Sequence, residues 1–209
     1  HCEYLASRGM IAMTADYRVK SRQGTTPFDC VEDGKSAIRY VRQHAKKLGV
    51  DPNRIAAGGG SAGGHVAAAT ATVPGLESED ENKKISSKPD ALILFNPVYD
   101  NGPKGYGYDR VQGRHLEISP IHNLRKGVPP SIVFLGDQDK LIPVSTAKRF
   151  KSLAEKAGGR SDLYVYKDQP HGFFNRGKDG NFFAKTVFEM DQFLSSLGWL
   201  NGEPTIQVP

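Results

Sequence analysis

The chain has 209 residues, of which 38% are hydrophobic and 24% are charged, and this composition indicates a globular rather than a disordered protein. Its net charge is +5, but the basic residues are scattered in pairs without interleaved aromatic residues, which argues against a nucleic-acid-binding surface. No apolar run approaches the length that spans a membrane. We therefore expect a globular chain with a sizeable core, folded as one domain over residues 1–209.

The first half of the chain alternates helical and extended patterns. Residues 1–9 are typical of the last turns of a helix that ends at a glycine, and the apolar run Met10–Tyr17 predicts a buried strand. A helix is expected over about 28–48, where apolar residues recur at steps of three and four. A short strand at 54–57 follows, and a glycine-rich turn and an alanine-rich helix come directly after it.

The glycine-rich turn carries the pattern G-x-S-x-G at Gly59, Ser61 and Gly63. A serine exposed at a sharp turn between a strand and a helix has a strained backbone, and side chains two residues away would clash there. The helix that follows also points its unpaired N–H groups at the serine. Ser61 is therefore the candidate nucleophile. The alternatives are a turn that serves only close packing, or a phosphate loop, which is disfavoured because no Lys-Ser or Lys-Thr pair follows the glycines.

The second half of the chain predicts the rest of a layered α/β fold. Three more strands and two more helices are expected, at 91–95, 131–135 and 163–166 and at about 143–157 and 181–197. This alternation predicts a mostly parallel sheet of about five strands with helices on both faces. Residues 98–130 form a long tyrosine-bearing loop, which we interpret as a lid or binding loop beside the active site or, alternatively, as plain surface.

Candidate reactive side chains follow three of the predicted strand ends: Ser61, Asp139 and His171. The carboxyl ends of parallel strands meet at one edge of a sheet, so these side chains are expected to converge. A serine hydroxyl needs a base, a histidine can act as that base near neutral pH, and a carboxylate can hold the histidine in the required tautomer. Asp137 is the competing acid, although it is better suited to capping the turn. His65 is a competing histidine, for which we prefer packing behind the nucleophile.

These motifs together resemble the α/β-hydrolase family. The resemblance is carried by Gly59–Gly64, Gly136–Asp139 and His171–Phe173, with a similar Asp16–Arg18, and it extends over about residues 4–198. It is strongest to esterases and lipases related to hormone-sensitive lipase and to bacterial acetyl or feruloyl esterases. The family's chain order is nucleophile, acid and histidine, as it is here. The motifs in this order are specific for the fold and less specific for esterase activity.

The resemblance implies a reaction and assigns residues to it. Ser61 would attack an ester carbonyl, His171 would take the proton of the hydroxyl, and Asp139 would orient His171. An acyl-enzyme would form and would then be hydrolysed. The backbone N–H of Ala62 would be one donor to the oxyanion.

The sequence departs from the family at its beginning. The family's second oxyanion donor normally comes from a His-Gly-Gly-Gly-like loop upstream of the first expected strand, and these residues contain no such motif. The expected strands resemble the family's fourth to eighth, so its central third strand is absent as well. We therefore expect these residues to be the carboxyl-terminal part of a longer hydrolase, with a sheet edge open to self-association.

Three functions stay open at this point. The first is a serine carboxylesterase that hydrolyses small, acetyl-like esters, with a carbohydrate ester as one candidate substrate. The second is a serine peptidase of the prolyl-oligopeptidase type, which shares the fold and the residue order. The third is a non-catalytic fragment or binding module with an incomplete oxyanion hole. We expect no metal or cofactor. Cys2 and Cys30 show neither a disulfide framework nor a metal-ligand spacing, and the compartment stays open.

Overall fold

The computed structural model describes residues 1–208. The described residues form two compact units. The larger unit is Asp16–His171 and contains the whole sheet. The smaller unit combines His1–Ala15 with the residues from Gly172 onward and contains the first and last α-helices.

The larger unit is built on a parallel sheet whose four described strands stand in chain order, β1-β2-β3-β4. The strands are β1 (Ala56–Gly60), β2 (Ala91–Phe95), β3 (Ser131–Gly136) and β4 (Ser161–Tyr166). Every residue of β2 and β3 is buried, as is typical of central strands in a parallel sheet. The register pairs Gly60 with Phe95 and Phe95 with Phe134, so β1 and β2 end side by side and β3 continues two residues further, to Gly136.

The sheet has four described strands rather than the five expected, because Met10–Tyr17 forms no strand in the part of the chain that the structure describes. A strand requires a neighbour that satisfies its backbone N–H and C=O groups, and none of the described strands pairs with this segment. Ile11 and Met13 are 51% and 45% exposed. The prediction was wrong because an apolar run indicates burial but does not supply a hydrogen-bonding partner.

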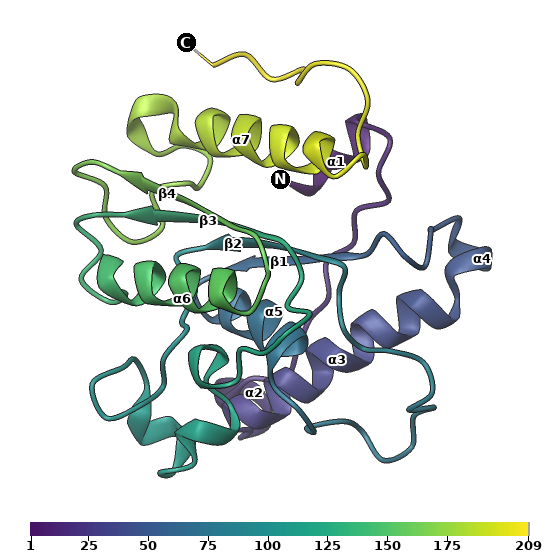
Figure 1. Cartoon of the computed structure of the whole chain (residues 1–209), viewed down its shortest axis with the longest axis vertical. Helices are drawn as coiled ribbons and strands as arrows, with labels where there is room; N and C mark the ends of the chain where they lie inside the picture. The colour runs from purple at the N-terminus through teal and green to yellow at the C-terminus, as the bar shows by residue number, and fades with distance from the viewer. Residues whose placement is uncertain (209) are drawn as a thin grey trace. The chain divides into compact units, whose positions relative to one another are not determined.

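The longer helices of the larger unit, α3, α5 and α6, lie on one side of the sheet (Figure 1). The helices of this unit are α2 (Lys20–Gln23), α3 (Pro27–Gln43), α4 (Ala45–Leu48), α5 (Ala62–Thr72) and α6 (Val144–Lys156). The helix expected over 28–48 is divided at His44, whose φ of −102° and ψ of 16° leave the helical range. α3 begins with a capping box, in which the Asp29 carboxylate accepts from the Thr26 N–H at 2.8 Å.

Helix α5 contacts α3 as well as the strands β1 and β2. A glycine at position 34 permits this approach, since a Cβ there would stand 2.5 Å from Cγ1 of Val66. Three alanines of α5 are also buried: Ala67, Ala68 and Ala69 are each 5% exposed or less. Small side chains along α5 therefore let it pack closely, and this packing fixes where its first turn meets the end of β1.

The loop over residues 98–130 is more ordered than its sequence suggested. Along its described course it contains short 3-10 helices, η1 (Tyr108–Val111), η2 (His115–Glu117) and η3 (Pro120–His122). Its first residues are joined to η3, because the Ile121 N–H donates to the Tyr99 carbonyl at 3.0 Å. The Tyr99 ring stacks on Phe150 of α6 with centroids 3.8 Å apart. Tyr99 is 1% exposed and belongs to the core rather than to the exposed part of the loop.

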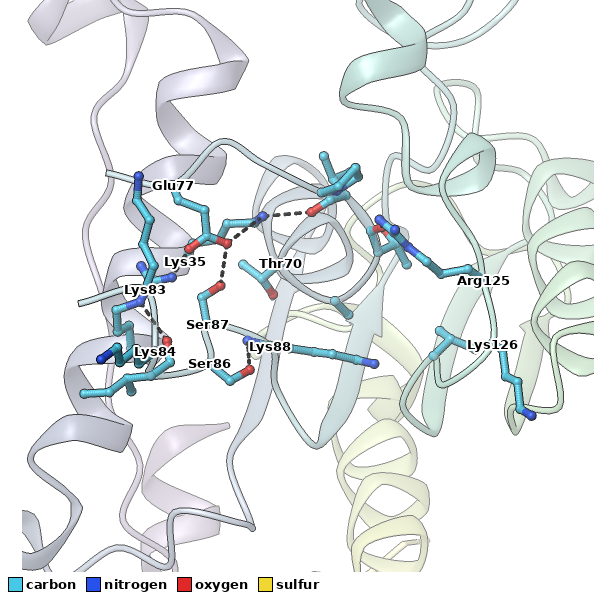
Figure 2. A pocket seen from close by; sticks show the side chains of 17 residues that line it. Lys35, Thr70, Glu77, Lys83, Lys84, Ser86, Ser87, Lys88, Arg125 and Lys126 are labelled. Carbon is cyan, nitrogen blue, oxygen red and sulfur yellow. Dashed lines mark hydrogen bonds and ion pairs between the residues drawn. The ribbon is translucent and has the colours of Figure 1, made fainter. Parts of the chain in front are cut away.

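A basic cavity of about 540 Å³ lies at the amino-terminal ends of the strands. Lys35 and Arg39 of α3 line it, although each is only 2% exposed, and both form ion pairs with Glu77. Figure 2 shows Glu77 between Lys35 and Ser87, whose hydroxyl donates to Glu77 at 3.0 Å. Burial, with the nearby charge of Arg39, lowers the pKa of Lys35 to about 8. These contacts hold the polar loop at 74–88 against α3.

The smaller unit joins the first helix to the last. Its helices are α1 (Cys2–Ser7), η4 (Asp179–Asn181) and α7 (Phe182–Ser196). The carboxylate of Asp191, which is fully buried, accepts from the Tyr4 hydroxyl and from Nε of Arg8, both at 2.6 Å. α1 ends before Gly9, whose φ of 86° confirms the predicted glycine stop. In both units, the described helices lack the combination of length and apolar character needed to cross a bilayer.

Candidate active site

Ser61 lies between the last residue of β1 and the first residue of α5. Its φ of 54° and ψ of −115° place a non-glycine residue in a region that costs on the order of 1–3 kcal/mol. The surrounding backbone holds this conformation: the Ser61 N–H donates to the Phe95 carbonyl, and the Ser61 carbonyl accepts from the His65 N–H, both at 2.9 Å. The strained turn predicted for a nucleophilic serine is therefore present.

The glycines around Ser61 differ in what they permit. A Cβ on Gly59 would lie 2.6 Å from the backbone carbon of Gly63, and a Cβ on Gly64 would lie 2.9 Å from Pro97. For a Cβ on Gly63, no described atom outside the backbone of its own helix lies within 4 Å. The need for small residues thus falls on Gly59 and Gly64, whereas Gly63 matters because its backbone is approached by position 59.

His171 and Asp139 are in direct contact. Nδ1 of His171 is 2.7 Å from Oδ2 of Asp139, whose side chain is fully buried. The other oxygen, Oδ1, accepts from the backbone N–H groups of Leu141 at 2.8 Å and Ile142 at 3.0 Å. An ionised carboxylate can only accept hydrogen bonds, so Nδ1 carries a proton, and in the neutral ring Nε2 then has the lone pair. This is the tautomer that a general base needs.

The turn after β3 separates the two candidate acids. Asp137 accepts from the Asp168 N–H at 2.7 Å and so caps the loop that follows β4. That loop also lies against the end of β3, where a Cβ on Gly136 would stand 2.1 Å from the Gln169 carbonyl oxygen. This close approach brings the loop that carries His171 to the side of Asp139. The structure thus pairs His171 with Asp139, the acid preferred from the sequence, and gives Asp137 a capping contact.

Asn96, which the sequence analysis missed, lies beside the histidine. It directly follows β2, is 1% exposed and has a φ of 34°. Its side-chain Nδ2 is 3.4 Å from Nε2 of His171. The signal that could have found it is its position, because Asn96 follows a buried strand just as Ser61 follows β1.

The structure brings the predicted residues to one edge of the sheet without joining all of them. Gly60 pairs with Phe95, so Ser61 and Asn96 leave neighbouring strands side by side. No hydrogen bond between Ser61 and His171 is present among the described residues; Nε2 of His171 contacts Asn96 instead. Catalytic hydrogen bonds between a nucleophile and its base are often long or poorly aligned before substrate binds, and they tighten only in the complex with substrate.

Ala62 lines a second cavity, of about 410 Å³, next to the Ser61 turn. As the first residue of α5, Ala62 has an N–H that the helix itself cannot satisfy. The cavity wall includes Tyr17, and residues of the loop at 98–130 contribute to it, among them Asn101 and Tyr106. Part of the loop predicted as a lid or binding loop therefore borders the space beside the candidate oxyanion donor.

His65 belongs to the wall of this second cavity and is 5% exposed. Its Nε2 lies 3.3 Å from the carbonyl oxygen of Ile118. Burial lowers the pKa of His65 to about 4, so the ring is neutral over the physiological range. His65 packs behind the nucleophile turn, as the sequence suggested, and holds the loop near residue 118 to α5.

Comparison with known proteins gives consistent matches. A family model described as BD-FAE matches residues 1–101. Among solved structures, the thermophilic esterase Est2 of Thermogutta terrifontis, with propionate bound, is 47% identical to this chain. That alignment covers 97% of this chain and 77% of the solved one, with a TM-score of 0.91.

Curated relatives carry esterase names as well. The acetylxylan esterase of Xylanibacter ruminicola is 27% identical over 97% of this chain, and esterase LipC of Mycobacterium tuberculosis is 31% identical over 81%. The chain spans 41% and 46% of the lengths of these two relatives. A parallel sheet with a strained serine turn, superposed almost completely on a solved esterase of high identity, establishes the kinship. The chain belongs to the esterases of the α/β-hydrolase family.

Proposed function

We propose that this chain carries the active site of a serine carboxylesterase for small acyl esters. The observation that carries the proposal is the hydrogen bond between His171 and Asp139, which leaves Nε2 of the imidazole as an acceptor at the strand edge where Ser61 emerges. The esterase names of the relatives favour an ester over a peptide as substrate.

The proposed reaction uses each of these groups in turn. Ser61 Oγ attacks the ester carbonyl while Nε2 of His171 takes the hydroxyl proton, and the Asp139 carboxylate stabilises the resulting imidazolium. The N–H of Ala62 donates to the oxyanion, a contact of a kind that contributes about 10²–10³-fold to turnover. The alcohol leaves with the proton held on Nε2, and a water molecule then hydrolyses the acyl-enzyme by the same steps in reverse order.

The size of the second cavity favours a short acyl group or a compact alcohol. Its volume of about 410 Å³ lies near the lower end of ligand sites, which span roughly 300–1,000 Å³. The tyrosines at 17 and 106 offer flat apolar surfaces with a polar tip, which suit a sugar ring. Propionate in the similar esterase and the acetylxylan name of a curated relative support an acetyl-like ester, with a carbohydrate ester as one candidate.

The test is hydrolysis of p-nitrophenyl acetate by the chain and by Ser61→Ala. We expect the variant to lose about 10³-fold or more in kcat, because the nucleophile is removed. A fluorophosphonate probe should label the folded wild type and not the variant. Ser152→Ala is the matched control, since Ser152 is an exposed serine of α6. Equal turnover by Ser61→Ala would contradict the proposal, and absence of labelling in the folded wild type would favour a non-catalytic binding module.

A further inference from the structure

The side chain of Asn96 is held in a defined place. Its backbone N–H donates to the Phe134 carbonyl at 2.7 Å, which anchors the residue to the neighbouring strand. Its φ of 34° is uncommon for residues other than glycine, although asparagine tolerates this region better than most. With 1% of its surface exposed, the side chain has little freedom to turn away from His171. Its amide is therefore a fixed feature of the site.

The imidazole of His171 is contacted on both ring nitrogens. Asp139 accepts from Nδ1 at 2.7 Å, and the Asn96 Nδ2 lies 3.4 Å from Nε2. An amide nitrogen can only donate, so the ring nitrogen that faces it must be the unprotonated one. Both neighbours thus demand the same tautomer, with the proton on Nδ1 and the lone pair on Nε2.

This tautomer matters for the reaction because a protonated Nε2 cannot accept the Ser61 proton. Ser61 and Asn96 directly follow the paired last residues of β1 and β2, so the hydroxyl and the amide belong to residues at the same carboxyl-terminal end of the sheet. In the structure the amide occupies Nε2. A hydrogen bond from a neutral amide is weak, so it can hold Nε2 in the unprotonated form and then be replaced by a hydrogen bond from the Ser61 hydroxyl.

We propose that Asn96 is a positioning residue, whose amide donates to Nε2 of His171 and, together with Asp139, fixes the imidazole in the Nδ1-protonated tautomer. The catalytic consequence rests on the proposed function, but the tautomer itself does not. The competing explanation is that Asn96 serves only the backbone turn after β2.

The two explanations predict opposite orders for two variants. Asn96→Asp keeps the size and the tolerance for positive φ, so a backbone role would survive in it better than in Asn96→Ala. A carboxylate, however, can only accept, and at this position it would stabilise a proton on Nε2. If Asn96 fixes the tautomer, Asn96→Asp should therefore be the more damaging change.

The direct test is ¹⁵N NMR of the histidine rings at a pH where they are neutral, with His171→Gln used to assign the signal. In the wild type, Nε2 of His171 should give the shift of an unprotonated ring nitrogen. In Asn96→Asp the shift should move towards that of a protonated one. Asn96→Ala, which adds no buried charge, should move the Nε2 signal towards that of a lone pair without a donor. An unchanged Nε2 shift in both variants would overturn the proposal, whether or not the chain hydrolyses esters.

Kinetics supply the second readout. We expect kcat to fall about tenfold in Asn96→Ala and about a hundredfold in Asn96→Asp with little change in KM, because general-base catalysis as a whole contributes about 10²–10⁴-fold. Asn53→Asp, in the exposed turn before β1, adds the same charge elsewhere and should change neither kcat nor the Nε2 shift. Circular dichroism checks that each variant folds. An Asn96→Asp enzyme as active as Asn96→Ala, or more so, would point to the backbone role.

Discussion

Ionisable side chains are buried at both ends of the sheet, but their hydrogen-bond and ion-pair partners differ between the two ends. At the amino-terminal ends, Lys35 and Arg39 are paired with Glu77 and bonded to backbone carbonyls of the loop they hold. At the carboxyl ends, His171 is bonded to Asp139 through one nitrogen, while the other nitrogen faces only a neutral amide of Asn96 among the contacts described for it. The buried cations Lys35 and Arg39 are thus held in ion pairs at the first end, whereas Nε2 of His171 contacts a neutral group at the second.

This contrast shows why burial and cavity size do not by themselves identify an active site. The basic cavity, at about 540 Å³, is larger than the cavity beside Ala62, at about 410 Å³. It also contains a lysine with a strongly lowered pKa, of about 8. Lys35 and Arg39 are nevertheless bonded to the loop at 74–88, and Figure 2 shows Glu77 of that loop between Lys35 and Ser87. We therefore expect substitutions at the two ends to separate activity from stability.

The largest expected effect is that of Asp139→Asn on turnover. An amide can donate to Nδ1 and would then favour a proton on Nε2, so kcat should fall by about 10³-fold or more. The oxygen of the new amide can still accept from Leu141 and Ile142, and the fold should persist. Steady-state kinetics with p-nitrophenyl acetate and a thermal melt measure the two properties. Unchanged turnover would remove His171–Asp139 from the proposed mechanism.

Glu77→Gln should have the opposite profile, with stability lost and kcat retained. It leaves the buried Lys35 without its carboxylate partner and Arg39 with Glu81 alone among its described ion pairs, and breaking a buried ion pair costs about 3 kcal/mol. Urea unfolding measures this loss. The matched control is Glu155→Gln, because its pair with Lys151 is exposed and should contribute less than about 1 kcal/mol. Equal unfolding midpoints for the two variants would contradict the contrast between a buried and an exposed pair.

His65, which lies near the carboxyl-terminal end of the sheet, should make the folding stability of the chain sensitive to acid. Its folded-state pKa is lowered from 6.5 to about 4 by burial, so between these values the unfolded chain binds a proton that the folded chain does not. Stability from this group is therefore complete above about pH 6.5 and is lost as the pH falls towards 4, by about 3 kcal/mol at most. Urea unfolding at several pH values should show a shallower acid loss in His65→Asn. Parallel curves for wild type and variant would show that His65 does not titrate this way.

The smallest expected effect separates two glycines of the nucleophile turn. Gly59→Ala places a methyl group against the backbone of Gly63 and should destabilise the chain by about 2 kcal/mol, as overpacking does. Gly63→Ala places its methyl group where no described neighbour outside its helix lies, and alanine is the better helix former, so stability should hold or rise slightly. Thermal melts of both variants measure the difference. A reversed order would mean that the turn rearranges around position 59.

Much of the fold was predictable because hydrophobic runs and glycine turns act locally. The strand at 91–95 was predicted to the residue, since a fully apolar run with polar borders admits few other interpretations. β1 was placed too early, at 54–57 instead of 56–60. Its last residues are glycines, which have a low intrinsic strand preference and become a strand because β2 supplies hydrogen-bonding partners. The same dependence on partners explains why Met10–Tyr17 was wrongly predicted as a strand.

Within the candidate site, the residues with distinctive chemistry were easier to predict than their neighbours. Motif and chain order singled out Ser61, Asp139 and His171, and the structure brings Asp139 and His171 into contact. Asn96 was missed because an asparagine before a proline is typical of many turns, and its significance lies in the register between β1 and β2. A role that depends on the position of a residue across neighbouring strands can be predicted only when the register of the sheet is known.

Two contacts hold the base of the loop that borders the second cavity. Tyr99 stacks on Phe150, and the Ile121 N–H donates to the Tyr99 carbonyl. A further hydrogen bond joins the two sides of this base, because the Ser119 hydroxyl accepts from the Asn101 N–H at 2.9 Å. Exchanging the stretch between positions 102 and 117 for another of different length should therefore leave the parallel sheet and the helices packed on it undisturbed. Substitutions in that stretch can then change the lining of the second cavity without altering the ends of β1 and β2, where Ser61 and Asn96 lie.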